Sequence, residues 1–179
     1  NDFNCPRNCE MIHNLGMGPS DASGWSDDIV PGGSTAIYIE NNNFRNNDPL
    51  FGSANPAYFW GNSSVQSYYG ARTIFRYNNL LMSQIDQHGT SGMIGARWWE
   101  IYENTFDTNV PNASQCCFIT LRAGSGVVYN NHHTGANLNG NSIDLYEEDS
   151  GYPALYQIGR GKNQVLDPAY LWGNDPFFS

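Results

Sequence analysis

One eight-residue pattern recurs along the chain and restricts its fold more than any other feature. The order is apolar, any, apolar, any two, asparagine, any, apolar. The copies read Ile37-x-Ile39-x-x-Asn42-x-Phe44, Thr73-x-Phe75-x-x-Asn78-x-Leu80, Trp99-x-Ile101-x-x-Asn104-x-Phe106 and, more weakly, Gly126-x-Val128-x-x-Asn131-x-His133. By subtraction of residue numbers, Phe75 and Ile101 are 26 residues apart, and Ile101 and Val128 are 27 apart. This period fits one coil of a parallel β-solenoid and is too short for a strand–helix–strand unit.

The chemistry of the pattern supports the same architecture. Alternating apolar residues of a strand point to one side, and stacked coils bring them together in a continuous core. An asparagine at the following turn tolerates left-handed backbone geometry and can bond to the asparagine of the next coil. We therefore expect an asparagine ladder. Helical periodicity is weak throughout the chain.

Two further internal sequence repeats accompany the main pattern. Residues 56–62 (PAYFWGN) return almost unchanged as residues 168–174 (PAYLWGN). Gly70-Ala71-Arg72 returns as Gly95-Ala96-Arg97 after 25 residues, which is one residue less than the strand spacing. A bulge or turn must absorb this difference.

The domain organisation follows from where the pattern fits. Residues 1–33 are expected to form an irregular lead-in or cap, and residues 34–179 the coils, with loops at 45–69 and 107–120. Residues 134–168 match the repeat poorly, although Ile143 and Leu145 alternate as a strand would. The ends of a solenoid need caps, and the C-terminal residues 175–179 form no evident cap. Continuation into a longer chain, or self-association through the solenoid ends, would account for this.

Charge excludes some partners. The formal net charge is −9, and Lys162 is the only lysine, so nucleic acid and anionic membranes are poor partners. No apolar run reaches the length of a membrane span. The four cysteines are Cys5, Cys9, Cys116 and Cys117, and their spacing favours disulfides or buried thiols over a zinc site.

The strand–asparagine–apolar units, such as Trp99 to Phe106, resemble coils of the right-handed parallel β-helix proteins typified by pectate lyases. They also resemble secreted bacterial β-helix proteins of unassigned activity. The resemblance implies an all-β, single-domain, right-handed parallel β-helix solenoid with projecting loops, located outside the cell. Members of this superfamily include polysaccharide lyases, inverting glycosidases, phage tailspikes and adhesins, so the fold alone does not select a function.

Asp86 and His88 form the most suggestive catalytic pair. In an extended segment they share one face, so the carboxylate could orient the imidazole as a general base. The alternative is an Asp and a His that close a polar turn.

Arg72, Arg97 and Arg122 are spaced 25 residues apart. This spacing predicts a row along one edge of successive coils, which a lyase could use to neutralise carboxylates and developing negative charge. In the alternative interpretation each arginine pairs with a nearby acidic side chain and has a structural role.

Aromatic and acidic residues supply the remaining candidates. Outward rings such as Trp98 and Tyr102 could form a platform for sugar faces, or pack as ordinary parts of the solenoid. The acidic run 147–149 is a solvated loop or a weak calcium site, and no aspartate cluster occurs at one-coil spacing. The need for a cofactor stays open.

These features predict an extracellular protein that binds, and could cleave, a polysaccharide. Asp86, His88 and Arg97 are the catalytic candidates, and Arg72, Arg122, Trp98 and Tyr102 are the binding candidates. The rival hypothesis is a non-catalytic structural or adhesive rod, of the surface, filament or phage-tail type.

Overall fold

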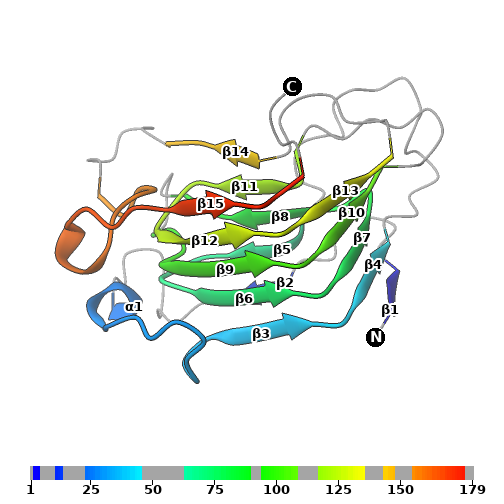
Figure 1. The fold of residues 1–179 in the computed structure, drawn as a ribbon. Coiled ribbons are helices and arrows are strands. Elements are labelled where there is room, and N and C mark those ends of the chain that lie inside the picture. The colour runs from blue at the N-terminus through cyan, green and yellow to red at the C-terminus, as the bar shows by residue number, and fades with distance from the viewer. Residues whose placement is uncertain are drawn as a thin grey trace, which may run out of the picture.

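The computed structural model describes residues 2–4, 11–13, 23–45, 63–89, 94–108, 117–135, 143–147 and 155–175. These residues form three five-stranded sheets in which every neighbouring pair of strands is parallel. Because consecutive strands belong to different sheets, the chain visits each sheet once per coil (Figure 1). The all-β, parallel solenoid expected from the repeat is confirmed.

We name the sheets A, B and C. Sheet A contains, in order, β1 (Asp2–Asn4), β4 (Asn43–Arg45), β7 (Asn79–Leu81), β10 (Thr105–Asp107) and β13 (His132–Thr134). Sheet B contains β2 (Met11–His13), β5 (Ser63–Ser67), β8 (Gln84–Gln87), β11 (Ile119–Leu121) and β14 (Ile143–Leu145). Sheet C contains β3 (Ile37–Glu40), β6 (Arg72–Arg76), β9 (Trp98–Tyr102), β12 (Ser125–Tyr129) and β15 (Tyr170–Trp172).

The core lies between the three sheets and contains the apolar residues of the repeat. Phe75, Ile101 and Val128 lie side by side in sheet C and are fully buried. Sheet A adds a second buried row. Its members in the described coils are Phe44, Leu80 and Phe106. The alternation read from the sequence therefore places the predicted side chains inside.

The expected asparagine ladder joins sheets C and A. Its described rungs are Asn42, Asn78, Asn104, Asn131 and Asn174, and each Nδ2 donates to Oδ1 of the next rung at 2.9–3.1 Å. One detail of the prediction was wrong: the left-handed residue is not the ladder asparagine but the residue before it. Asn41, Tyr77, Glu103, Asn130 and Gly173 have φ between 50° and 60°. Across this turn the asparagine Nδ2 donates to the carbonyl oxygen two residues earlier, as Asn78 does to Arg76 at 2.9 Å.

Several segments contain more regular structure than the sequence predicted. Strand β5 forms within the predicted loop 45–69, and β1 and β2 within the lead-in extend sheets A and B. The short helix α1 (Ser23–Ser26) follows them, and the 3₁₀ helix η2 (Lys162–Gln164) precedes β15. The second copy of the seven-residue repeat, residues 168–174, contains β15 and the ladder residue Asn174. The first copy lies outside the described residues.

Among the described residues, no helix is long and apolar enough to cross a membrane.

Candidate functional site

The predicted catalytic residues Asp86 and His88 lie on the outer side of sheet B, at the end of β8. Asp86 is buried and is bound by Arg122, whose Nε donates to Oδ1 at 3.0 Å and whose Nη2 donates to Oδ2. The Nδ1 of His88 lies 3.0 Å from the carbonyl oxygen of Gly89, and its ring packs on Tyr68 with a centroid distance of 4.4 Å. Within the described part of the chain, His88 makes no hydrogen bond to Asp86. The structure thus brings Asp86 to Arg122 rather than to His88.

The other two arginines of the predicted row lie elsewhere. Arg72 begins β6 and is directly beside Trp98 in the sheet, because Arg97 falls one residue before β9. The one-residue offset seen in the sequence is therefore absorbed at this turn. Arg122 follows β11 of sheet B. Arg72 and Arg97 therefore lie at the same edge of adjacent coils, one position apart in register, and Arg122 alone departs from the predicted row.

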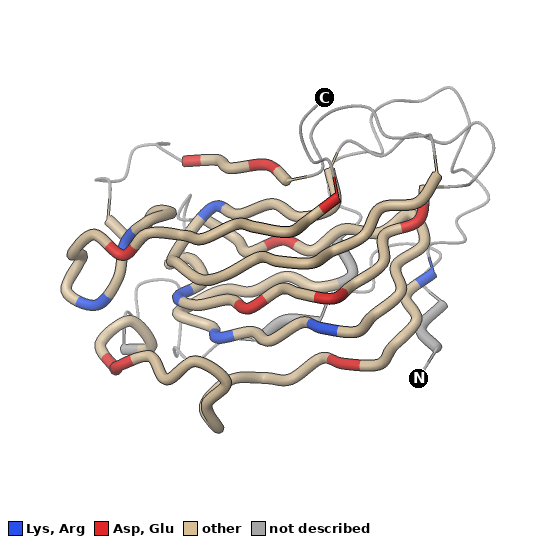
Figure 2. The backbone as a smooth tube through the Cα atoms, in the orientation of Figure 1, with Lys and Arg blue, Asp and Glu red and all other residues tan. Residues whose placement is uncertain are grey.

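Arg72 and Arg97 are both buried at the edge where the strands of sheet C begin. Several of the basic positions gather at this edge in Figure 2. Arg72 donates to Thr35 Oγ1 at 2.8 Å and to Asp27 Oδ2 at 3.3 Å. Arg97 donates to Asp167 Oδ2 at 3.3 Å. These pairs match the structural interpretation of the arginines.

Trp98 and Tyr102 lie at the two ends of β9, on the outer face of sheet C. The indole Nε1 of Trp98 donates to Glu100 Oε1 at 3.0 Å, and the backbone N–H of Gly32 donates to the same oxygen at 2.7 Å. The segment that precedes β3 therefore crosses this face. Glu100 and its neighbour Ile74 are buried although they point away from the core.

Tyr102 belongs to a column of stacked rings on the outer face of sheet C. The rings of Tyr102 and Tyr129 are 4.6 Å apart and nearly parallel, and those of Tyr129 and Trp172 are 4.5 Å apart. The Arg76 guanidinium covers the other face of Tyr102. Arg76 Nη1 also donates to the Tyr102 hydroxyl at 2.6 Å, and Tyr102 is buried, so little of this side chain is open to a ligand. Burial, followed by the nearby Tyr102, raises the pKa of Tyr129.

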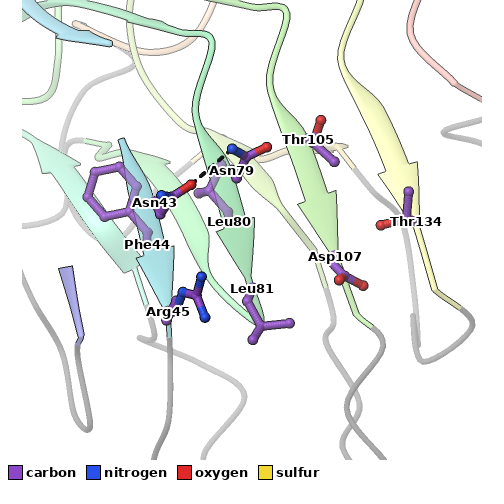
Figure 3. Close-up of a pocket in the computed structure, with 9 residues that line it drawn as sticks. All are labelled: Asn43, Phe44, Arg45, Asn79, Leu80, Leu81, Thr105, Asp107 and Thr134. Carbon is purple, nitrogen blue, oxygen red and sulfur yellow. Dashed lines mark hydrogen bonds between the residues drawn. The ribbon is translucent and has the colours of Figure 1, made fainter. Parts of the chain in front are cut away.

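A groove on the outer face of sheet A was missed at the sequence level. Its volume is about 250 Å³, and its floor is formed by four adjacent strands (Figure 3). The lining residues are Asn43, Phe44, Arg45, Asn79, Leu80, Leu81, Thr105, Asp107 and Thr134. Asn79 Nδ2 donates to Asn43 Oδ1 at 3.0 Å. Phe44 and Leu80 belong to the core, and the other side chains face outward.

The outward groove residues form two rows across the strands. Asn43, Asn79 and Thr105 form one row, and Arg45, Leu81, Asp107 and Thr134 form the other. A signal for this groove existed in the sequence: the residues on either side of Phe44, Leu80 and Phe106 are mostly polar. That signal is weak, because polar residues also occupy ordinary solvent-facing strand positions.

No group of three or more His, Cys, Asp or Glu side chains that could hold a metal ion occurs within the residues that the structure describes. Of the predicted calcium run, only Glu147 lies among them. Cys117 is buried, and its Sγ accepts from Gln84 Nε2 at 3.3 Å, whereas Cys5, Cys9 and Cys116 lie outside the described residues.

Comparisons with protein-family models, with curated proteins and with solved structures found no match to this chain.

Proposed function

We propose that this protein binds a polysaccharide along the groove over sheet A. The observation that carries the proposal is the pair of polar rows that cross the strands of this sheet. Amide and hydroxyl side chains recur from strand to strand, and neighbouring strands lie about 4.8 Å apart. A polymer of similar units lying along the solenoid axis would meet an amide or hydroxyl group at each of the three coils that contribute Asn43, Asn79 and Thr105. Leu81 offers an apolar contact for a sugar face in the middle of the groove.

Binding is better supported than cleavage. Asp86 is held by Arg122, His88 lies against Tyr68, and Arg97 is buried beside Asp167. These contacts do not gather the three predicted catalytic residues around one open site. Within the described groove lining, Asp107 is the one carboxylate, whereas hydrolysis by an inverting mechanism needs two at roughly 6.5–9.5 Å.

We also propose that the protein is extracellular, because a polysaccharide too large to enter a cell is encountered outside it. We further propose that the solenoid coils are right-handed, as in pectate-lyase-like proteins, because connections between parallel strands of one sheet are right-handed in about 98% of cases. The rigid rod with an adhesive or structural role is the second candidate, and the continuous asparagine ladder favours it.

Affinity electrophoresis through gels that contain neutral or acidic polysaccharides tests the proposal. At least one polymer should retard the protein, and Asn79→Ala or Leu81→Ser should weaken that retardation about tenfold, a loss of about 1.4 kcal/mol. Tyr170→Ala is the matched control, because Tyr170 is exposed on sheet C, outside the groove. Reducing ends and unsaturated uronate products should not accumulate.

Three results would change the conclusion. Loss of retardation in Tyr170→Ala alone would move the site to sheet C. Accumulating products would make the protein an enzyme. A folded protein that no polymer retards would leave the rod as the better hypothesis.

A further inference from the structure

Arg72 and Arg97 are unusual because charged side chains are rarely buried without full pairing. Each is 3% exposed. Arg72 pairs in register with Trp98, the residue that follows Arg97, so the two arginines lie on adjacent coils at this edge. Residues from α1 and from the segment around η2 cover them: Arg72 Nη2 donates to the Gly24 carbonyl at 3.3 Å, and the Arg97 guanidinium lies 5.5 Å from the ring centre of Trp25.

Several hydrogen-bond donors of this pair have no acceptor among the described residues. A guanidinium has five N–H donors, yet Arg97 has a single acceptor among the described residues, Asp167 at 3.3 Å. The buried Nε atoms of Arg72 and Arg97 have no partner there, and neither does the buried hydroxyl of Ser125. Ser125 and Arg72 flank Trp98 on the same side of sheet C. The unpaired donors of Arg72, Arg97 and Ser125 therefore occupy neighbouring positions at the start of β6, β9 and β12.

The countercharges are displaced toward solvent. The Asp27 side chain is 70% exposed and that of Asp167 is 34% exposed, and each lies 3.3 Å from its arginine. Such solvated carboxylates compensate a buried cation poorly. The pKa of Arg97 is lowered by burial and further by Arg72, while Asp167 opposes this shift. The buried positive charge is thus only partly balanced.

We propose that Arg72 and Arg97 form a binding site for a small inorganic anion, with the Ser125 hydroxyl as an additional donor. An anion accepts from several N–H groups at once and also supplies the missing negative charge, which a neutral acceptor cannot do. Trp25 covers one side of Arg97, so the site suits a halide or a compact oxyanion rather than an organic acid. The anion would link α1 to the segment before β15, across the coils between them.

Thermal unfolding at constant ionic strength tests the site. Sodium gluconate is replaced stepwise by sodium chloride, and in a second series by sodium sulfate, which separates a halide from an oxyanion. Because a ligand of the folded state raises its stability, the midpoint temperature should rise by about 3 °C and then level off in at least one series. Arg97→Gln should lose this rise. Arg76→Gln is the control, because Arg76 is paired with Glu40 and Tyr102 on the same sheet, and it should keep the rise.

A second measurement covers the case in which Arg97→Gln does not fold. Crystals of the unaltered protein are soaked in bromide, and an anomalous peak between the two guanidinium groups is expected; Ser125→Ala should weaken the thermal response without abolishing folding. Equal midpoints in gluconate, chloride and sulfate together with no bromide peak would overturn the site. So would a full response in Arg97→Gln.

Discussion

At the scale of single residues, Gln87 is in an unfavourable position. Its side chain points into the core from β8 and is fully buried, and neither its amide oxygen nor its amide nitrogen has a hydrogen-bond partner among the described residues. Its neighbours in the sheet are Ser67 on one side and Leu121 on the other. A buried amide without partners costs roughly 1–3 kcal/mol, so this residue lowers the stability of the coil.

We predict that Gln87→Leu raises the free energy of unfolding by about 1–2 kcal/mol, because an apolar side chain of similar size removes the unpaired groups. Urea denaturation monitored by circular dichroism measures the change. Gln84→Leu is the control, because the Gln84 amide donates to Thr120 and Cys117 and should lose stability when replaced. A loss of stability in Gln87→Leu would show that Gln87 is hydrogen-bonded in solution.

The sequence predicted which residues are buried better than what they contact. Ile101 and Phe106 follow the repeat, and their burial could be read from it directly. The partner of Arg122 could not, because Asp86 is 36 residues away and reaches it only through the pairing of β8 with β11. The covered faces of Tyr102 depend likewise on neighbours from other coils. Local alternation determines which side a residue faces, whereas contacts across coils depend on loop lengths.

At the scale of strands, the largest core residue, Trp99, has room because the neighbouring strand has a glycine at the paired position. Trp99 of β9 is fully buried, and its Nε1 donates to the Ala123 carbonyl at 3.0 Å. Gly126 of β12 lies directly opposite. A Cβ atom on Gly126 would be 1.9 Å from the carbonyl oxygen of Trp99 and 2.6 Å from its ring. This contact explains why the repeat has glycine at the position that Ile37, Thr73 and Trp99 occupy in other coils.

We predict that Gly126→Ala lowers the free energy of unfolding by about 3 kcal/mol or more, because β9 and β12 must separate to admit the methyl group. Thermal and urea denaturation measure the loss. The control is Gly32→Ala, where nothing lies within 4 Å and the cost is the strain of φ = 63° alone, about 1 kcal/mol. Similar losses in the two variants would mean that strand separation costs little.

The strands themselves were largely predictable, and the groove was not. The repeat placed β6, β9 and β12 because their apolar residues alternate. The groove over sheet A depends instead on outward residues, which no packing constraint fixes in the sequence. Its two rows became visible only when the register aligned Asn43 with Asn79 and Leu81 with Asp107.

At the scale of the molecule, the solenoid is held together by contacts between adjacent coils, supplemented by the contact of α1 with η2. The stability of such a structure depends on each interface between neighbours. Asn104 takes part in two of these interfaces. Its Oδ1 accepts from the backbone and side chain of Asn78, and its Nδ2 donates to the Phe75 carbonyl, the Tyr102 carbonyl and Asn131 Oδ1, all at 2.9–3.1 Å.

We predict that Asn104→Ala lowers the free energy of unfolding by about 4 kcal/mol, because it leaves buried donors and acceptors unpaired in two neighbouring coils. Asn79→Ala is the matched control: the same side chain, one residue beyond the ladder, is exposed and bonds to Asn43, so about 0.5 kcal/mol or less is expected. Native-state hydrogen exchange tests how far the effect of this substitution extends along the solenoid. Because Asn104 joins the coils on both sides, amides of β6 and β12 should lose protection together. Loss confined to β9 would mean that the ladder stabilises each turn separately and does not couple the coils.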